Sequence, residues 1–329
     1  MSAPGTTERD VAVVVEHLDG RIAEVSFEML ARGRTLATAT GGRLVAVVAG
    51  PDARRLAGEL GAADAVAVVE HATLAHYTPE AYLHAHRAAL ERLAPRVTLV
   101  ASSSMGLDQA AGLAVALDWP LCAYCTDVRV EDGALVAVSQ IYGGKLVAEA
   151  RVDGPRAVCA LLPGAGPPPT GGGTGAPAVE EIPAPDLGAA RIRFRRLVAP
   201  EAGDVDIARE GILVSVGRGI QSQDNLPLVE ALAEALGAAV SASRPIVDQG
   251  WLPKSRQVGK SGLTVKPRLY LAVGISGAPE HLEGMRGAEL IVAINQDPGA
   301  PIFDVAHYGV AADLFDVLPA LTEKLKARA

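Results

Sequence analysis

The segment Ser241–His281 reads SASRPIVDQGWLPKSRQVGKSGLTVKPRLYLAVGISGAPEH, and it decides how the last third of the chain, 211–313, is expected to fold. Two short apolar runs, 238–240 just before it and 269–275 within it, each stop abruptly in small polar residues. Short strands that end in Gly/Ser turns are how α/β domains present backbone N–H groups to phosphates. We therefore expect a large anionic cofactor to bind here.

The same pattern, a buried run that stops in a polar turn, recurs on both sides of this segment. Residues 211–216 end in Gly-Arg-Gly at 217–219 and precede a helix expected over 225–236. Further runs end at Ile294 and within 306–312. Because the carboxyl ends of parallel strands lie along one edge of a sheet, these turns are expected to form one cleft. The side chains expected around it are Arg218, Ser243, Arg244, Ser276, His281, Asn295 and Asp313.

The Gly-x-Gly at 217–219 is a partial dinucleotide-binding motif. Strand, Gly-x-Gly and helix follow one another as in dinucleotide folds, but the third glycine of GxGxxG is missing. The two glycines are equally compatible with a tight turn that has no room for a side chain. Both interpretations stay open from the sequence.

The first half of the chain alternates buried strands with helices. Apolar runs cover 11–15, 44–48, 65–69 and 97–101, with helices expected over 23–38, 52–60 and 79–93. This alternation predicts a right-handed parallel α/β sheet. Residues 128–139 form a hairpin pattern, and 147–151 and 157–161 are further strands. A Ser-rich turn at 102–106 lies where nucleotides often bind, although a helix N-cap is the stronger interpretation.

Composition changes abruptly at 163–178, PGAGPPPTGGGTGAPA, which is typical of a linker. A basic strand-like run, RIRFRRLV, follows at 191–198 and predicts a sheet edge or a subunit contact. We expect an N-terminal nucleotide-binding-like α/β domain over 1–162, a Pro/Gly-rich linker and strand segment over 163–203, and a Rossmann-like domain over 204–329. The predicted fold class is therefore α/β with two parallel-sheet domains.

Composition excludes several classes of protein. The net charge of −8 argues against nonspecific nucleic-acid binding, which needs clustered Lys and Arg. No apolar run approaches the ~20 residues that span a bilayer, so no direct membrane insertion is expected. The start, MSAPGTTERD, lacks the pattern of a secretory signal, and three cysteines suit a reduced, cytoplasmic protein.

Two groups of residues are of types that bind metal ions, and a role without a metal is favoured for each. Cys122 and Cys125 form a single CxxC within an expected strand, so buried or half-buried thiols are favoured over zinc or thioredoxin-like chemistry. Four histidines lie around the expected helix 79–93 without metal-ligand spacing, and surface positions are favoured for them. They are His71, His76, His84 and His86.

Several stretches closely resemble the FAD-binding domain of the electron-transfer flavoprotein alpha subunit. They read GRGIQSQDN, ASRPIVDQGW, RQVGKSG, YLAVGISGAPEHLEGM, IVAINQDPGAPIFDVAHYG and DLFDVLPALTEKL, and the resemblance runs from 211 to 325. The first half is similar through VVVEH, the Ser-rich turn and QIYGGK. The resemblance implies FAD as cofactor and a heterodimer in which the N-terminal domain packs against a beta subunit. It also implies an electron carrier, not an enzyme, between flavin dehydrogenases such as acyl-CoA dehydrogenases and a membrane quinone reductase.

The resemblance also implies which residues contact FAD. The pyrophosphate side would include the turn at Arg218, the hydroxyls of Ser243 and Ser276, and the N–H groups of Gly277 and Ala278. The adenosine side would include Asn295, Gln296, Asp313 and Leu314. The flavin side and its surroundings would include Arg244, Gln257, Val258, Gly259, Lys260, Ser261, Gly274, Ile275 and His281.

The expected chemistry is electrostatic. A cation beside the flavin would stabilise its negatively charged reduced form, and His281 at a helix start and Arg244 are the candidates. About 1.4 kcal/mol moves a one-electron potential by roughly 60 mV. Three positions depart from the family pattern: Ser261 stands where Thr is frequent, Lys260 where Gln is common, and His307 where Asp is usual. The last substitution puts any cofactor role of that position in doubt.

Three alternative functions would differ from this one in the features named below. A bifurcating complex would accept NADH and hold a second FAD in the beta subunit, and nothing in this chain distinguishes it. A nicotinamide-dependent oxidoreductase would typically carry an acidic residue ~20 residues after the glycine turn. The corresponding VSASR, 240–244, has none. A nucleotide-binding scaffold without redox chemistry would be colourless when purified.

Overall fold

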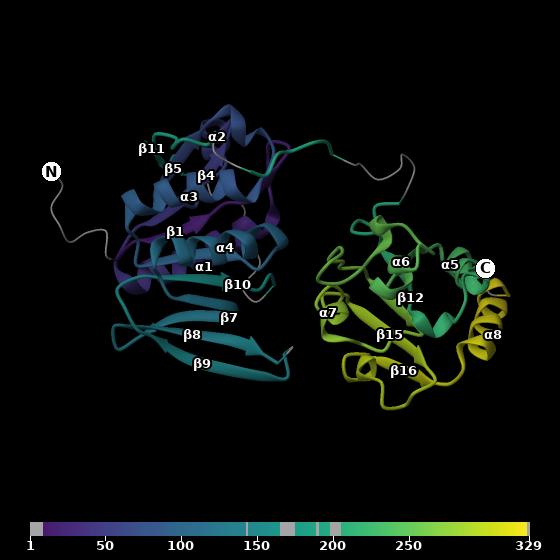
Figure 1. Cartoon of the computed structure of the whole chain (residues 1–329). Coiled ribbons are helices and arrows are strands. Elements are labelled where there is room, and N and C mark those ends of the chain that lie inside the picture. Colours follow the sequence, from purple (N-terminus) through teal and green to yellow (C-terminus); the bar gives the residue numbers. More distant parts are fainter. Residues whose placement is uncertain (1–8, 143, 165–174, 189–190, 198–204, 328–329) are drawn as a thin grey trace. The chain divides into compact units, whose positions relative to one another are not determined.

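The computed structural model describes residues 9–142, 144–164, 175–188, 191–197 and 205–327. The chain divides into two compact units, residues 1–196 and 197–329 (Figure 1). Most of the Pro/Gly-rich stretch expected to be a linker lies outside the described residues. Each unit has its own sheet and its own apolar core.

The first unit is built on a large mixed sheet. Its strands are β1 (Val11–Val14), β4 (Leu44–Gly50), β5 (Ala65–Glu70), β6 (Val97–Ala101), β7 (Leu121–Glu131), β8 (Ala134–Ile141), β9 (Leu146–Val152), β10 (Ala157–Leu161) and β11 (Ala178–Glu181). Their order across the sheet is β11-β5-β4-β1-β6-β10-β7-β8-β9. A separate two-stranded ladder joins β2 (His17–Leu18) to β3 (Arg21–Ile22). The parallel sheet predicted from the alternating runs is confirmed for β11 through β7.

Helices cover both faces of this sheet, which explains its apolar central strands. The helices are α1 (Glu24–Thr40), α2 (Ala53–Ala57), α3 (Pro79–Leu93) and α4 (Ser104–Leu117). Apolar side chains of α1 and α2 pack with Val11 and Val13, whereas those of α3 and α4 pack with Ala12 and Val14. Parallel strands covered in this way read as continuous apolar runs, as β1 and β4 do.

The Ser-rich turn before α4 is a helix cap, as the stronger interpretation predicted. The Ser103 hydroxyl accepts a hydrogen bond from Gly106 N at 2.8 Å, and it donates to a carboxylate oxygen of Glu16 at 2.6 Å. A Cβ on Gly106 would lie 2.0 Å from the Ala101 carbonyl oxygen. The turn is therefore packed against the end of β6.

The far side of the sheet is antiparallel. β8 pairs with β7 and β9 pairs with β8 in antiparallel registers, which confirms the hairpin pattern. At the opposite edge β11 pairs with β5, so the chain does rejoin the sheet after the linker. It does so at 178–181 and not at the basic run: residues 191–197 form no strand, and the strand-like interpretation of them was wrong. The side chains of this run are exposed, so it has no buried face that would fix it against the sheet.

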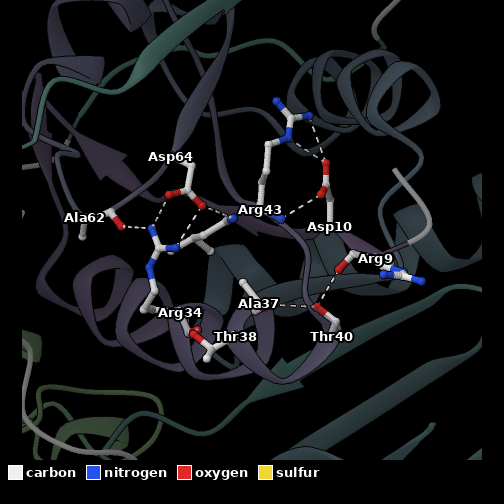
Figure 2. A network of polar contacts seen from close by, with 10 residues as sticks. Arg9, Asp10, Arg34, Ala37, Thr38, Thr40, Arg43, Ala62 and Asp64 are labelled. Atoms are coloured by element: carbon white, nitrogen blue, oxygen red, sulfur yellow. Dashed lines mark hydrogen bonds and ion pairs between the residues drawn. The ribbon is translucent and has the colours of Figure 1, made fainter. Parts of the chain in front are cut away.

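A polar network fastens the start of β4 (Figure 2). The Asp10 carboxylate accepts hydrogen bonds from Arg43 N at 2.8 Å and from the Arg43 guanidinium at 2.9 Å. The Asp64 carboxylate accepts two bonds from Arg34 on α1 and one from Leu44 N at 2.7 Å. The Arg34 guanidinium holds the pKa of Asp64 below its ordinary value. These acids satisfy the backbone N–H groups that begin the strand.

The second unit carries an entirely parallel sheet. Its strands are β12 (Ile212–Val216), β13 (Ala239–Ala242), β14 (Leu269–Val273), β15 (Leu290–Asn295) and β16 (Tyr308–Ala311), in the order β13-β12-β14-β15-β16. Its helices are α5 (Leu226–Leu236), α6 (Arg244–Asp248), α7 (Pro279–Leu282) and α8 (Leu314–Lys326). α5 and α8 pack on one face, with Val214 and Val273, while Tyr270 and Leu282 lie in the core of the other face. The α/β fold class with two sheets is therefore confirmed.

Candidate functional site

The carboxyl ends of the five parallel strands of the second unit are level with one another. Val216, at the end of β12, is paired with Ala242 on one side and Val273 on the other. Val273 is paired with Ile294, and Asn295 with Ala311. The turns that follow these strands consequently share one edge of the sheet, as the sequence predicted. This is the edge at which open parallel sheets bind ligands.

Two of these turns touch backbone to backbone. Gly217 N donates to Val273 O at 2.8 Å, and Gly219 N donates to Gly274 O at 3.0 Å. A Cβ on Gly217 would lie 2.3 Å from that same Gly274 oxygen. Glycine at 217 and 219 is thus explained by the close approach of the β12 and β14 turns, which favours the steric interpretation of the partial motif.

The turn after β14 presents backbone donors. Within the described residues, the N–H groups of Ser276, Gly277 and Ala278 have no protein acceptor. Ser276 O accepts from Ile302 N at 3.0 Å, and Gly277 has a φ of 85° with no room for a Cβ beside Ile302. Successive unpaired N–H groups in such a turn form a concavity suited to an anion.

A second loop, 257–261, is fastened beside this edge. Val258 N donates to Ala242 O at 2.9 Å, and Lys260 N donates to Glu280 O at 2.7 Å. The buried Gln257 side chain donates to the Ser261 hydroxyl at 2.8 Å. Gly259, with a φ of 129°, lies against the backbone of Glu280. The structure therefore brings residues 257–261 together with α7.

The arginine and lysine side chains expected at the site differ in their surroundings. Arg218 is exposed at the start of a short 3-10 helix, Arg218–Ile220. Arg244 donates from Nε to the Asp248 carboxylate at 3.1 Å, and both side chains are largely exposed. Lys260 Nζ lies 3.9 Å from the Glu283 carboxylate. Neighbouring acids thus partly offset the charges of Arg244 and Lys260.

His281 is buried, and burial lowers its pKa from 6.5 to about 4. Its Nε2 lies 2.9 Å from the Tyr270 hydroxyl. The Val258 backbone counteracts the lowering, although Nδ1 forms no hydrogen bond of normal geometry there. A phenol is the better donor and a neutral imidazole nitrogen the better acceptor, so we assign the proton of this hydrogen bond to Tyr270, which leaves the ring proton on Nδ1. The ring is therefore neutral at pH 7, whereas the sequence led us to expect a cation.

The expected adenosine side lies at the β15 and β16 turns. Asn295 Nδ2 donates to Ile275 O at 2.9 Å, and the exposed Asp313 caps α8 by accepting from Phe315 N at 2.9 Å. Gln296 is exposed, and Leu314 is buried next to Gly274. Ser243 is buried at the start of α6, and Ile275 is buried after β14.

Other predicted positions lie away from this edge. His307 accepts from Ile291 N at 2.9 Å, at the amino ends of β15 and β16, which explains the side chain without a cofactor. His71, His76 and His84 are exposed, but His86 is buried against Gln109 at 2.9 Å, so its predicted surface position was wrong. Its face of α3 packs on the sheet, where helical spacing places every third or fourth residue. Cys122 is partly buried and Cys125 buried, as predicted.

Within the described residues, no group of three or more His, Cys, Asp or Glu side chains is arranged to hold a metal ion. Among the helices of that part of the chain, none combines the length and apolar character that crossing a bilayer requires. A hollow of about 390 Å³ lies beside the start of β13, lined by residues such as Glu230 and Arg256. None of the expected FAD contacts lines this hollow, so it is not the candidate site.

Sequence reasoning missed three residues of this region. Tyr270, Asp248 and Glu283 contact His281, Arg244 and Lys260 respectively. Tyr270 had one visible signal, because it interrupts the aliphatic strand LYLAV in a chain with only 4% aromatic residues. Asp248 lies four residues after Arg244, the spacing of a helical ion pair. Glu283 had no signal, since its partner comes from a separate loop.

A parallel sheet with phosphate-type turns along one carboxyl edge defines a dinucleotide-binding α/β protein. Comparison with known proteins narrows this class. Residues 11–187 match the electron transfer flavoprotein domain, and residues 206–286 match the electron transfer flavoprotein FAD-binding domain. The chain belongs to the electron transfer flavoprotein alpha subunit family, and FAD is the cofactor of its second unit.

Individual relatives are similar along their whole length. The electron transfer flavoprotein subunit alpha of Mycobacterium tuberculosis is 40% identical, with 97% of this chain and 99% of the relative covered. That of Mycobacterium leprae is 38% identical with the same coverage. The protein FixB of Azotobacter vinelandii is 37% identical, with 97% of this chain and 92% of the relative covered.

Proposed function

We propose that this chain carries electrons as the alpha subunit of an alpha–beta heterodimer. FAD at the carboxyl edge of the second sheet would accept electrons from flavin dehydrogenases, such as the acyl-CoA dehydrogenases of fatty acid oxidation, and deliver them towards a quinone reductase. The observation that supports this most is the run of backbone N–H groups at 276–278, which find no acceptor in the part of the chain that the structure describes, on the edge where five strands end level.

The residues at this edge fit the pyrophosphate of FAD. The N–H groups of Gly277 and Ala278 would act as donors, and Ser243 and Ser276 follow β13 and β14, the strands on either side of β12. Exposed Arg218 adds a positive charge. Because Gly217 and Gly274 keep the two turns in contact, a phosphate would meet backbone there and not side chains.

The residues of the 257–261 loop fit the flavin end. When bound, FAD supplies reversible uptake of one or two electrons. Gln257 orients the Ser261 hydroxyl, and the contacts of Val258 and Lys260 hold the loop between β13 and α7. Arg244, exposed at the start of α6, is the cation that would favour negative charge on the flavin. His281, being neutral, would act by supporting the loop and not by its charge.

The first unit offers a surface for the beta subunit. β9 is the outermost strand of its sheet, and its outer backbone edge is unpaired among the described residues. Leu146 and Val147 are 55% and 63% exposed on this strand. An exposed apolar edge strand favours pairing with another chain. We propose that the beta subunit covers this edge.

Co-expression with a candidate beta subunit, followed by a flavin count and a reductive titration, tests this function. The expected result is a yellow heterodimer with one FAD that accepts electrons from an acyl-CoA dehydrogenase. Two FAD per heterodimer and reduction by NADH would favour the bifurcating arrangement. A colourless complex that takes up no FAD would refute the proposal.

A further inference from the structure

The three cysteines of this chain lie together in the first unit. Cys122 and Cys125 are on β7, and Cys159 is on the adjacent parallel strand β10. Cys125 and Cys159 belong to the apolar cluster on the α1 face, and Cys122 packs against that cluster. All three thiols therefore approach the same side of the sheet.

A bulge in β7 produces this arrangement. Residues three apart on a regular strand point to opposite faces. Here Cys122 is paired with Cys159 and Cys125 with Leu161, so three steps on β7 match two on β10. The extra residue is accommodated where Tyr124 adopts a φ of 54°. Bulges re-aim side chains in this way.

Strand geometry selects one pair that could form a disulfide. Directly paired residues on neighbouring strands are about 4.8 Å apart at Cα, which lies within the range that disulfides span. Cys122 and Cys159 are such a pair. Cys122 and Cys125 span the bulge, where three steps of β7 match two of β10, about 6.6 Å along the strand. Cys125 is offset from Cys159 by the same two steps and also lies on the other strand, which puts the two Cα atoms about 8 Å apart. The first separation is at the upper limit of the Cα range of disulfides and the second exceeds it, so the directly paired Cys122 and Cys159 are the best suited pair.

The three thiols differ in access and in acidity. Cys122 is only partly buried, whereas Cys125 and Cys159 are 0% exposed. Interaction with the Cys159 thiol lowers the pKa of Cys122 to about 7, against the effect of burial. The Cys159 pKa is raised by Cys122 and Cys125 as well as by burial. The accessible thiol is thus also one that ionises at neutral pH, as reactive cysteines do.

We propose that Cys122 is a hydroperoxide-sensitive thiol that forms a disulfide with Cys159. The Cys122 thiolate attacks the terminal oxygen of the hydroperoxide, the O–O bond breaks, and an alcohol or water leaves. The resulting sulfenic acid is attacked by the Cys159 sulfur, the S–O bond breaks, and water leaves with the Cys159 proton. The two thiols together lose two electrons, and these two electrons reduce one hydroperoxide. The modification does not depend on FAD.

The test treats the purified full chain with hydrogen peroxide, blocks remaining thiols by alkylation, and identifies linked peptides by mass spectrometry. The expected product joins Cys122 to Cys159 in the wild type and in Cys125→Ser, the matched control. It should be absent from Cys122→Ser and Cys159→Ser. A Cys122–Cys125 product, or no linked peptide at any peroxide concentration that oxidises the chain, would overturn the proposal.

A second measurement needs no variant. Iodoacetamide should alkylate Cys122 of the native wild-type chain before it alkylates Cys125 and Cys159. As the pH is raised, the alkylation rate of Cys122 should reach half of its maximum near pH 7. If Cys122 reacts no faster than the two buried thiols, or only above about pH 8.5 as a free cysteine does, it is not the reactive group.

Discussion

The Nε2 atom of His281 lies 2.9 Å from the hydroxyl of Tyr270, and both side chains are buried in the core of the second unit. Tyr270 comes from the middle of β14, and His281 comes from α7 after the turn that presents unpaired N–H groups. With the Tyr270 hydroxyl as the donor of this bond, Nε2 accepts its proton and Nδ1 carries the ring proton. Tyr270 therefore holds the ring that supports the 257–261 loop.

Tyr270→Phe removes this hydroxyl while keeping the ring that fills the core. It leaves His281 Nε2 buried without a donor, which should cost about 1–3 kcal/mol of stability. In the nitrogen NMR spectrum of the histidine rings, His281 should shift from the Nδ1–H tautomer to a mixture. Tyr308→Phe is the control, because Tyr308 is 66% exposed. An unchanged His281 signal would show that Tyr270 does not set the tautomer.

His281 should make the protein sensitive to acid. Its folded pKa, about 4, lies below the ordinary 6.5, so the unfolded chain binds the proton more readily. The stability this ring contributes is complete above pH 6.5 and is lost as the pH falls towards 4. At about 1.4 kcal/mol per pKa unit, the loss approaches about 3 kcal/mol. Urea unfolding of His281→Gln between pH 7 and 4.5 should show a weaker pH dependence than the wild type, and equal slopes would contradict this.

Gly217→Ala should damage the cofactor edge. Its Cβ would lie 2.3 Å from Gly274 O, so the two turns must separate. Overpacking of this kind costs roughly 1–3 kcal/mol, and we expect at least a tenfold weaker FAD affinity in a fluorescence titration. Gly237→Ala is the matched control, since Gly237 ends α5 with a φ of 60° and nothing within 4 Å of its Cβ position. Equal affinity losses in both variants would argue against a role for the turn contact.

Asp10→Asn should destabilise the first unit. The Asp10 side chain is 5% exposed and accepts hydrogen bonds from both the backbone and the guanidinium of Arg43 (Figure 2). Hydrogen bonds to charged groups contribute about 1.5–3 kcal/mol, so a loss of this size is expected in chemical unfolding. Glu59→Gln alters only an exposed ion pair with Arg55 and should change stability by less than about 0.5 kcal/mol. Similar effects of the two substitutions would contradict the assignment.

The strands were predictable because burial on both faces leaves continuous apolar runs. β6, β10 and α3 have the bounds that their runs and flanking residues predicted. The basic run 191–197 failed because alternation alone says nothing about whether a partner strand exists. β11 was hidden, since a four-residue strand after a Pro/Gly-rich stretch carries almost no pattern.

The position of the candidate site at a set of strand ends was predictable, but the charge states and ion pairs of its residues were not. Level strand ends follow from parallel register, which the apolar runs indicate. Whether a histidine is charged depends on its burial and on partners distant in sequence, such as Tyr270 and Val258. The partial neutralisation of Lys260 by Glu283 depends on a contact of the same kind, whereas the Arg244–Asp248 pair follows from helical spacing.

Amide hydrogen exchange with and without FAD tests the central claim most directly. Exchange at Ser276, Gly277 and Ala278 should slow at least about tenfold when saturating FAD is added to the apoprotein. The segment around His307, at the opposite edge of the same sheet, should be unaffected. If FAD bound while exchange at 276–278 stayed unchanged, the cofactor would not lie on the carboxyl edge of this sheet, and the account would be wrong.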